Sequence, residues 1–176
     1  MMKSADRLRV GVSHCLLGAA CRYDGGSAEL RLLEEILGAR CVLIPVCPEV
    51  EIGLPVPREK ILLVGPREAP EVLGEESGRT FGERLRTFAR GWLLGVGELH
   101  GFVLQSRSPS CGVGSCWRRE RRESEPLRDG TGLFAEVLLA THPGLPVRED
   151  TDLPGAAACR AFLAEVEAYA SRREKE

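Results

Sequence analysis

Short apolar runs alternate along the chain with longer segments in which apolar residues recur at helical spacing. The continuous runs, rich in Val, Ile and Leu, are typical of buried parallel strands. They fall at residues 8–13, 41–46, 60–64, 101–105 and 146–148. Apolar residues three or four positions apart indicate amphipathic helices. These helices are expected at about residues 27–37, 79–99, 133–140 and 156–171.

The repeated order of strand, loop and helix decides the expected fold class. Such alternation predicts a parallel sheet with helices on both faces. We therefore expect an α/β protein, a single compact three-layer domain with a mostly parallel, Rossmann-like sheet. The 176 residues leave room for one such domain. It would span residues 1–176, with a core at about 8–149 and a C-terminal helix at about 156–171.

Local signals place some of the boundaries. Ser27 is a good N-cap for the first helix, and Gly38 is a typical stop after it. The three prolines of residues 47–58 predict an ordered loop, and the Gly, Pro and Glu residues of 65–76 predict an exposed one.

The net charge and the polar N-terminus bear on whether the chain is a nucleic-acid-binding, secreted or membrane protein. The formal net charge is −2, so an extended nucleic-acid surface is not the first expectation. The arginines at 118–122 are interleaved with glutamates and indicate a solvated loop or helix end. The N-terminus has no apolar h-region, and no segment is long and apolar enough to span a membrane. We expect a cytoplasmic protein without a membrane partner.

The seven cysteines carry the sharpest chemical signal. Cys15, Cys47 and Cys111 each follow a predicted strand, and sites in open parallel sheets form outside the carboxyl ends of the strands. The three thiols should therefore meet at one edge of the sheet. No paired C-x₂-C typical of structural zinc is present. Three thiolates from separate strands suit an iron–sulfur cluster with one iron free of protein ligands.

Each cysteine also has a plainer interpretation, because free cysteine is often a small core residue. That interpretation is favoured for Cys41, which opens an apolar strand, and for Cys159 on the last helix. Cys21 and Cys116 lie a few residues after proposed ligands, and their roles stay open.

Polar residues beside the three cysteines suggest further chemistry. Glu49 lies two residues after Cys47 and could act as a general base toward water, although a surface glutamate is the alternative. The hydroxyls of Ser108 and Ser110 could hydrogen-bond a substrate or a cluster sulfide, or form an ordinary Ser-Pro-Ser turn. His14 could serve as a base or be structural, and the Asp-Gly-Gly at 24–26 could approach a ligand or simply turn the chain.

Three segments together resemble the thiouracil desulfidase family, formerly a domain family of unknown function. They are S-H-C-L-L-G-A-A-C-R-Y-D-G-G at 13–26, V-C-P-E at 46–49 with G-L-P-V-P-R at 53–58, and S-R-S-P-S-C-G at 106–112. The resemblance runs in order over about residues 8–149. This chain differs in having Ile52-Gly53 where the family favours a glycine pair, and in a long Arg-rich segment at 117–128. Both differences bear on the shape of the pocket.

The resemblance implies a [4Fe-4S] cluster on Cys15, Cys47 and Cys111, with the fourth iron binding the sulfur of a thiolated pyrimidine. It implies that Glu49 activates water and that Ser108 contacts the substrate. The implied reaction is hydrolytic and non-redox: C=S becomes C=O and sulfide leaves. A 2-thiouracil-like base or nucleoside is expected ahead of thiolated RNA, and the oligomeric state stays open.

Two rival hypotheses come from other classes. A non-catalytic iron–sulfur or zinc-binding redox or regulatory module would make Glu49 and Ser108 dispensable. A small nucleotide-binding domain without metal would not need the cysteines, but the chain has no Walker-type phosphate loop and no G-x-G-x-x-G after a strand.

Overall fold

The computed structural model describes residues 7–173, and its centre is a four-stranded parallel sheet. The strands are β1 (Leu8–Ser13), β2 (Cys41–Val46), β5 (Gly101–Leu104) and β8 (Val147–Glu149), in the order β2-β1-β5-β8. β1 is the long central strand and pairs with β2 over its whole length, from Leu8 opposite Cys41 to Ser13 opposite Val46. The strand predictions for these four segments are confirmed.

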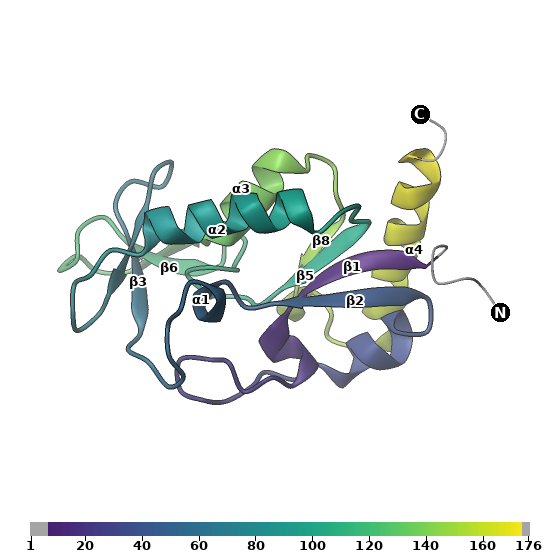
Figure 1. The fold of residues 1–176 in the computed structure, drawn as a ribbon, viewed down its shortest axis with the longest axis horizontal. Coiled ribbons are helices and arrows are strands. Elements are labelled where there is room, and N and C mark those ends of the chain that lie inside the picture. Colours follow the sequence, from purple (N-terminus) through teal and green to yellow (C-terminus); the bar gives the residue numbers. More distant parts are fainter. Residues whose placement is uncertain (1–6, 174–176) are drawn as a thin grey trace.

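Helices cover both faces of this sheet (Figure 1). The long helix α4 (Ala156–Arg173) and the short π-helix η3 (Leu33–Leu37) pack on one face, where Val10, Val12 and Phe162 are buried in one cluster. Helices α2 (Gly82–Gly95) and α3 (Leu133–Thr141) pack on the other, around Phe102 and Phe134. The predicted three-layer α/β fold is confirmed.

Gly11 shows why β1 carries a glycine at its centre. A Cβ atom at this position would lie 2.2 Å from the ring of Phe102 on the neighbouring strand. The missing side chain lets the Phe102 ring lie across β1, where it packs against Trp92 and Phe134 at centroid separations of 6.0 and 5.7 Å. The glycine therefore makes room for the aromatic core under α2.

A second sheet is built from the segments that follow β2 and β5, and of its strands the sequence predicted the one at 60–64, which is confirmed as β3. Its strands are β3 (Ile61–Val64), β4 (Glu71–Gly74), β6 (Cys116–Arg119) and β7 (Leu127–Gly130), in the order β4-β3-β6-β7. β3 and β6 are parallel, and the two outer strands are antiparallel to them. The expectation of loops at 65–76 and 118–122 was therefore wrong in part. Arg118 is 5% exposed, because its guanidinium pairs with Asp129 across the β6–β7 hairpin.

Two predicted helices begin later than expected, because backbone pairing occupies their first residues. Ser27 is not an N-cap: Ala28 and Leu30 donate their N–H groups to the carbonyls of Cys15 and Leu16 in an extended segment. Phe81 likewise donates to Val72 of β4, at 2.8 Å, so α2 starts at Gly82.

The last two helices and the limits of the described chain complete the fold. The predicted helices at 133–140 and 156–171 are confirmed as α3 and α4. Within residues 7–173, no helix has both the length and the apolar character that a membrane span requires. The predicted domain of 1–176 includes residues 1–6 and 174–176, which lie outside the described residues.

Candidate metal centre

The three predicted thiols line one cavity of about 440 Å³ at the carboxyl ends of the parallel strands. Cys15 lies in the 3-10 turn η2 (His14–Leu17) directly after β1, and Cys47 follows β2 at the start of the short helix α1 (Pro48–Glu51). Cys111 lies in the loop after β5. Segments more than 30 residues apart thus bring their sulfur atoms to one place.

The residues that line the cavity come from both sheets, so its walls differ in origin. The two sheets lie side by side in Figure 1. The parallel sheet and its loops contribute the thiols. The mixed sheet contributes Lys60, Ile61 and Leu62 from in and beside β3, and Trp117 from β6. A volume of this size is typical of sites that enclose small molecules.

Burial is the main cause of the raised pKa values of the three thiols. All seven cysteines are free, and Cys15 and Cys111 are buried while Cys47 is half-buried. Burial, with the charge of neighbouring Cys47 as a further cause, raises the pKa of Cys15 to about 11. Burial also raises the pKa of Cys47 to about 12, against a lowering hydrogen bond from the Val50 backbone. It raises the pKa of Cys111 well above its ordinary value, with Cys15 and Cys47 adding to the effect. A bound cation would reverse this mutual repulsion, since thiolates are the ligand form.

The loop that carries Cys111 is fixed by the first turn of α3. Leu133 donates its N–H to the carbonyl of Pro109 at 3.1 Å, and Phe134 donates to the carbonyl of Ser110 at 2.9 Å. These N–H groups have no partner within a helix. A Cβ atom on Gly132 would lie 2.4 Å from the carbonyl carbon of Ser110, so glycine permits this close approach. These hydrogen bonds tie the loop that carries Cys111 to the first turn of α3.

Ser108 and Ser110 have different roles in this loop. The hydroxyl oxygen of Ser108 accepts the N–H groups of Ser110 and Cys111, at 3.2 and 3.1 Å. A hydroxyl oxygen has two lone pairs, so the Ser108 proton is what remains to be donated, and the residue lines the cavity. Ser110 is fully buried and donates its hydroxyl to Oε1 of Glu49 at 3.0 Å.

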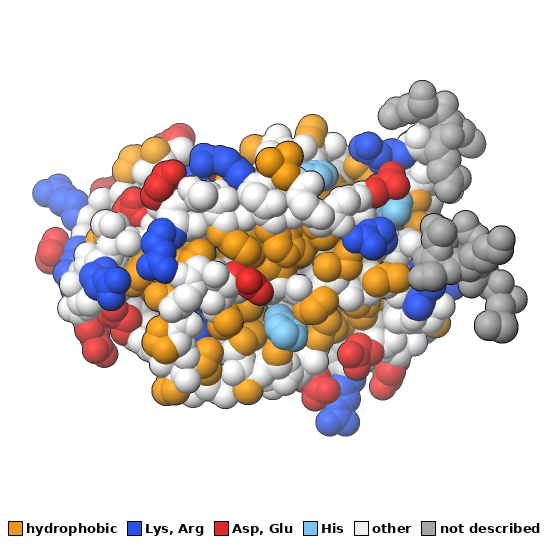
Figure 2. Space-filling model, viewed as in Figure 1, with side chains coloured by type: hydrophobic (Ala, Val, Ile, Leu, Met, Phe, Trp, Pro, Cys, Tyr) orange, Lys and Arg blue, Asp and Glu red, His pale blue; other side chains and the backbone are white. Residues whose placement is uncertain are grey.

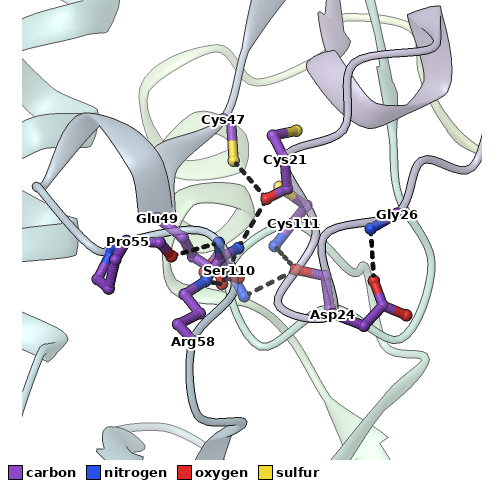
Figure 3. Close-up of polar contacts among 10 residues, drawn as sticks. Cys21, Asp24, Gly26, Cys47, Glu49, Pro55, Arg58, Ser110 and Cys111 are labelled. Atoms are coloured by element: carbon purple, nitrogen blue, oxygen red, sulfur yellow. Dashed lines mark hydrogen bonds and ion pairs between the residues drawn. The ribbon is translucent and has the colours of Figure 1, made fainter.

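Glu49 lies on α1 and reaches the same cavity wall (Figure 3). Its side chain is 12% exposed and forms an ion pair with Arg58, whose side chain is 5% exposed. The surface alternative for Glu49 is therefore wrong. Sequence reasoning missed Arg58, which appeared there only as the last residue of G-L-P-V-P-R.

The remaining candidates differ in their relation to the cavity. His14 lines it and is exposed. Asp24 is not one of the lining residues and forms a turn, accepting the Gly26 N–H at 3.0 Å. Arg22, Lys60 and Arg107 make the lining basic, since Glu49 is its one carboxylate among the described residues and is already paired. Figure 2 shows hydrophobic side chains gathered along the middle of one face below α2, with several Lys and Arg side chains at the end where β3 lies.

The other cysteines divide as the sequence suggested. Cys41 and Cys159 are buried in the core cluster under α4. Cys21 lines the cavity, and its carbonyl accepts the thiol of Cys47 at 3.9 Å. Cys116 lies in the core of the mixed sheet and donates its thiol to the carbonyl of Ser108 at 2.9 Å.

Two observations bear on whether these residues fit an iron–sulfur cluster. Within residues 7–173, no three His, Cys, Asp or Glu side chains converge closely enough to hold one metal ion. A cluster does not need such convergence, because each thiolate binds a different iron. The second observation is Ser106, whose hydroxyl is buried beside the cavity without a partner among the described residues. A buried hydroxyl needs an acceptor, and a cluster sulfide provides one. The donor set fits.

Comparisons with known proteins show the family to which the chain belongs. The family described as 2-thiouracil desulfurase matches residues 10–150. Among solved structures, the chain is similar to the [4Fe-4S]-dependent thiouracil desulfidase TudS, with 33% identity and a TM-score of 0.65 over 89% of this chain and 99% of that one. Comparison with curated proteins gave no match. The resemblance read from the three motifs is confirmed.

Proposed function

Since the chain belongs to the 2-thiouracil desulfurase family, we propose that it is a [4Fe-4S]-dependent desulfidase that hydrolyses the C=S group of a thiolated pyrimidine. The observation that carries the proposal is the single cavity lined by Cys15, Cys47, Cys111 and Glu49. The thiols provide soft ligands for iron, and the carboxylate provides a base beside them. A purely structural cluster would not need that base.

Cys15, Cys47 and Cys111 would hold the cluster, each as a thiolate. When bound, such a cluster supplies an iron without a protein ligand, which can take the thione sulfur and polarise its bond to carbon. The unpartnered Ser106 hydroxyl and the amide of Gln105, whose Oε1 accepts the Cys15 thiol at 3.3 Å, lie beside the same cavity. They are suited to hydrogen-bond the cluster and its ligands.

Glu49 would act on water. Its carboxylate accepts a proton from a water molecule while the water oxygen attacks the thiolated carbon. The C–S bond then breaks as the C=O bond forms. Glu49 gives back its proton and the new hydroxyl loses its own, so both protons of the water leave with the sulfur. The balance is C=S plus H₂O giving C=O plus H₂S, and no electrons are exchanged, so no reductant is required.

Ser108 would orient the substrate. With both lone pairs of its oxygen occupied by backbone N–H groups, the hydroxyl acts as a donor. A pyrimidine presents ring nitrogen and carbonyl acceptors next to its thione. We expect Ser108 to donate to one of these and to hold the thiolated carbon near Glu49.

A cavity of this volume favours a small substrate, a 2-thiouracil-like base or nucleoside, ahead of thiolated RNA. The basic side chains of Arg22, Lys60 and Arg107 in its lining suit a substrate with a polar or anionic substituent. We expect the protein to act in the cytoplasm, where thiolated pyrimidines would be free in solution.

Anaerobic reconstitution with iron and sulfide tests the proposal. We expect a visible absorption band and about four irons per chain. Cys15→Ser, Cys47→Ser and Cys111→Ser should each lose most of the iron, while Cys159→Ser, a change in the core under α4, should keep it. The loaded wild type should release sulfide from 2-thiouracil. A protein that binds iron through other cysteines, or releases no sulfide from any thiolated pyrimidine, would contradict the assignment.

A further inference from the structure

Arg58 is a charged side chain buried in the wall of the cavity, and its contacts explain why it is there. Its Nε lies 2.8 Å and its Nη2 2.7 Å from Oε2 of Glu49. Nη2 also donates to the carbonyl of Cys21 at 3.0 Å, and Nη1 to that of Pro55 at 3.2 Å (Figure 3). A buried cation is costly unless such partners are present. The guanidinium is therefore held in one orientation.

The contacts on Glu49 are distributed unequally between its two oxygens. Nε of Arg58 donates a hydrogen bond to Oε2 and Nη2 forms an ion pair with the same oxygen, while the Ser110 hydroxyl donates to Oε1. An ionised carboxylate offers about four lone-pair positions, two on each oxygen. The guanidinium lies against Oε2, and Ser110 fills one position of Oε1. The oxygen that keeps an acceptor position clear of the arginine is therefore Oε1.

We propose that Arg58 is a positioning residue for Glu49, which fixes the carboxylate so that Oε1 is the oxygen that takes the proton. The inference rests on the proposed function of Glu49 as a base. Arg58 acts through Glu49 and does not itself need to touch the substrate. Ser110, in the loop after β5, completes the arrangement, because its hydroxyl holds the same Oε1 in place.

Arg58 also connects the carboxylate to the segments that carry the thiols. The Cys21 carbonyl that it binds also accepts the Cys47 thiol, and the Arg58 N–H donates to the carbonyl of Tyr23 at 2.8 Å. The loop after β1, the helix α1 and the segment before β3 therefore meet at one guanidinium. A shift of any of these segments would move Glu49 relative to the cysteines.

Lysine at this position would keep the charge and lose the geometry. A guanidinium presents several N–H groups in a rigid fork, whereas an ammonium is a single point charge on a flexible stem. One nitrogen cannot bind Oε2 twice and also reach the carbonyls of Cys21 and Pro55. Arg58→Lys therefore keeps a positive charge beside Glu49 but removes the contacts that orient its carboxylate.

Arg118→Lys is the matched control. Arg118 has a similarly buried side chain, 6% exposed, and pairs with a carboxylate through Nε and Nη2, but it lies in the mixed sheet away from Glu49. Both variants and Arg58→Ala are reconstituted with the cluster. For each protein, kcat and KM for 2-thiouracil, bound iron and the melting temperature are measured.

We expect Arg58→Lys to lower kcat by about 10- to 100-fold, with KM, bound iron and melting temperature close to those of the wild type. Arg118→Lys should keep the wild-type kcat. Guanidinium ion added to Arg58→Ala should restore part of the turnover, and ammonium should not. The inference is wrong if kcat is unchanged in Arg58→Lys, if it falls only in proportion to bound iron, or if guanidinium restores nothing.

A crystal structure of Arg58→Lys supplies a readout that does not depend on turnover. We expect the Glu49 carboxylate to be rotated and its contact with Ser110 to be lost. An unchanged Glu49 would overturn the positioning role even in an active enzyme. A wild type that releases no sulfide would instead refute the proposed function, and the orientation of Glu49 would then decide the positioning role alone.

Discussion

Among the residues that the structure describes, two ion pairs contain a buried arginine side chain, one beside the cavity and one in the mixed sheet, and they are built differently. In the mixed sheet, Arg118 binds Asp129 side by side, with Nε 3.0 Å from Oδ1 and Nη2 2.8 Å from Oδ2. At the cavity, both nitrogens of Arg58 bind one oxygen of Glu49. The first pair engages both oxygens of the carboxylate, and the second leaves one to other partners.

This difference separates a pair that joins strands from a pair that would hold the proposed base. Arg118 and Asp129 lie on β6 and β7, and the side-by-side geometry ties the two strands of the hairpin together. Glu49 keeps Oε1 for Ser110 and for a proton. A salt bridge at a candidate active site is therefore better judged by which oxygen it occupies than by its length.

Matched amide substitutions give the largest expected contrast. Glu49→Gln keeps the size of the side chain and removes its basicity, so kcat should fall by about 10²- to 10⁴-fold, the usual loss of a general base. Asp129→Asn should leave kcat unchanged. Sulfide release by the reconstituted proteins measures both.

Bound iron is the control for this contrast. Glu49→Gln should keep its visible absorption band, because the three thiols are untouched. Loss of colour together with loss of turnover would give Glu49 a structural role and favour the non-catalytic alternative.

Ser110→Ala should have an intermediate effect. It removes the donor on Oε1 and leaves the Arg58 contacts in place, so the carboxylate is held from one side only. The loss of a hydrogen bond to a charged group predicts a fall in kcat of about 3- to 10-fold. Ser171→Ala, which removes a hydroxyl that bonds within α4, is the control. A Ser110→Ala enzyme as fast as the wild type would show that Arg58 alone orients Glu49.

The smallest effect concerns the mixed sheet and its dependence on pH. The hydrogen bonds from Arg118 hold the pKa of Asp129 below its usual value. A group with a lowered folded pKa contributes stability above its unfolded pKa and loses it as pH falls. Asp129→Asn should therefore melt at a lower temperature than the wild type at pH 7, and the difference should shrink below about pH 4. A difference that persists in acid would assign the effect to packing.

The predictable part of the fold is the part made of apolar runs. The strands at 8–13, 41–46 and 101–104 are buried and nearly free of charge, so composition alone identified them. The strands β6 and β7 contain Arg118, Arg119, Arg128 and Asp129, and the arginines at 118–122 predicted a solvated loop or helix end. Arg118 instead pairs with Asp129 across the hairpin, and that pairing is a tertiary contact that no local pattern contains.

The candidate site also has a part that the sequence predicted and a part that it did not. The convergence of Cys15, Cys47 and Cys111 followed from topology, because the carboxyl ends of parallel strands meet at one edge. The partnership of Arg58 with Glu49 could not be read from their spacing of nine residues, since the chain between them forms neither a continuous helix nor a strand. Ser110 was considered for a substrate or a cluster sulfide, and its contact with Glu49 joins residues 61 positions apart.

The two sheets contribute different residues to the cavity, and this has a consequence for how its specificity could change. The thiols are carried by the parallel sheet, whereas Lys60 and Trp117 belong to the segments after β2 and β5 that form the mixed sheet. A change in the length or composition of these segments would alter one wall of the cavity and leave the cysteines in place. In the proposed enzyme, the choice of substrate would therefore be free to change without any change in the residues that hold the cluster.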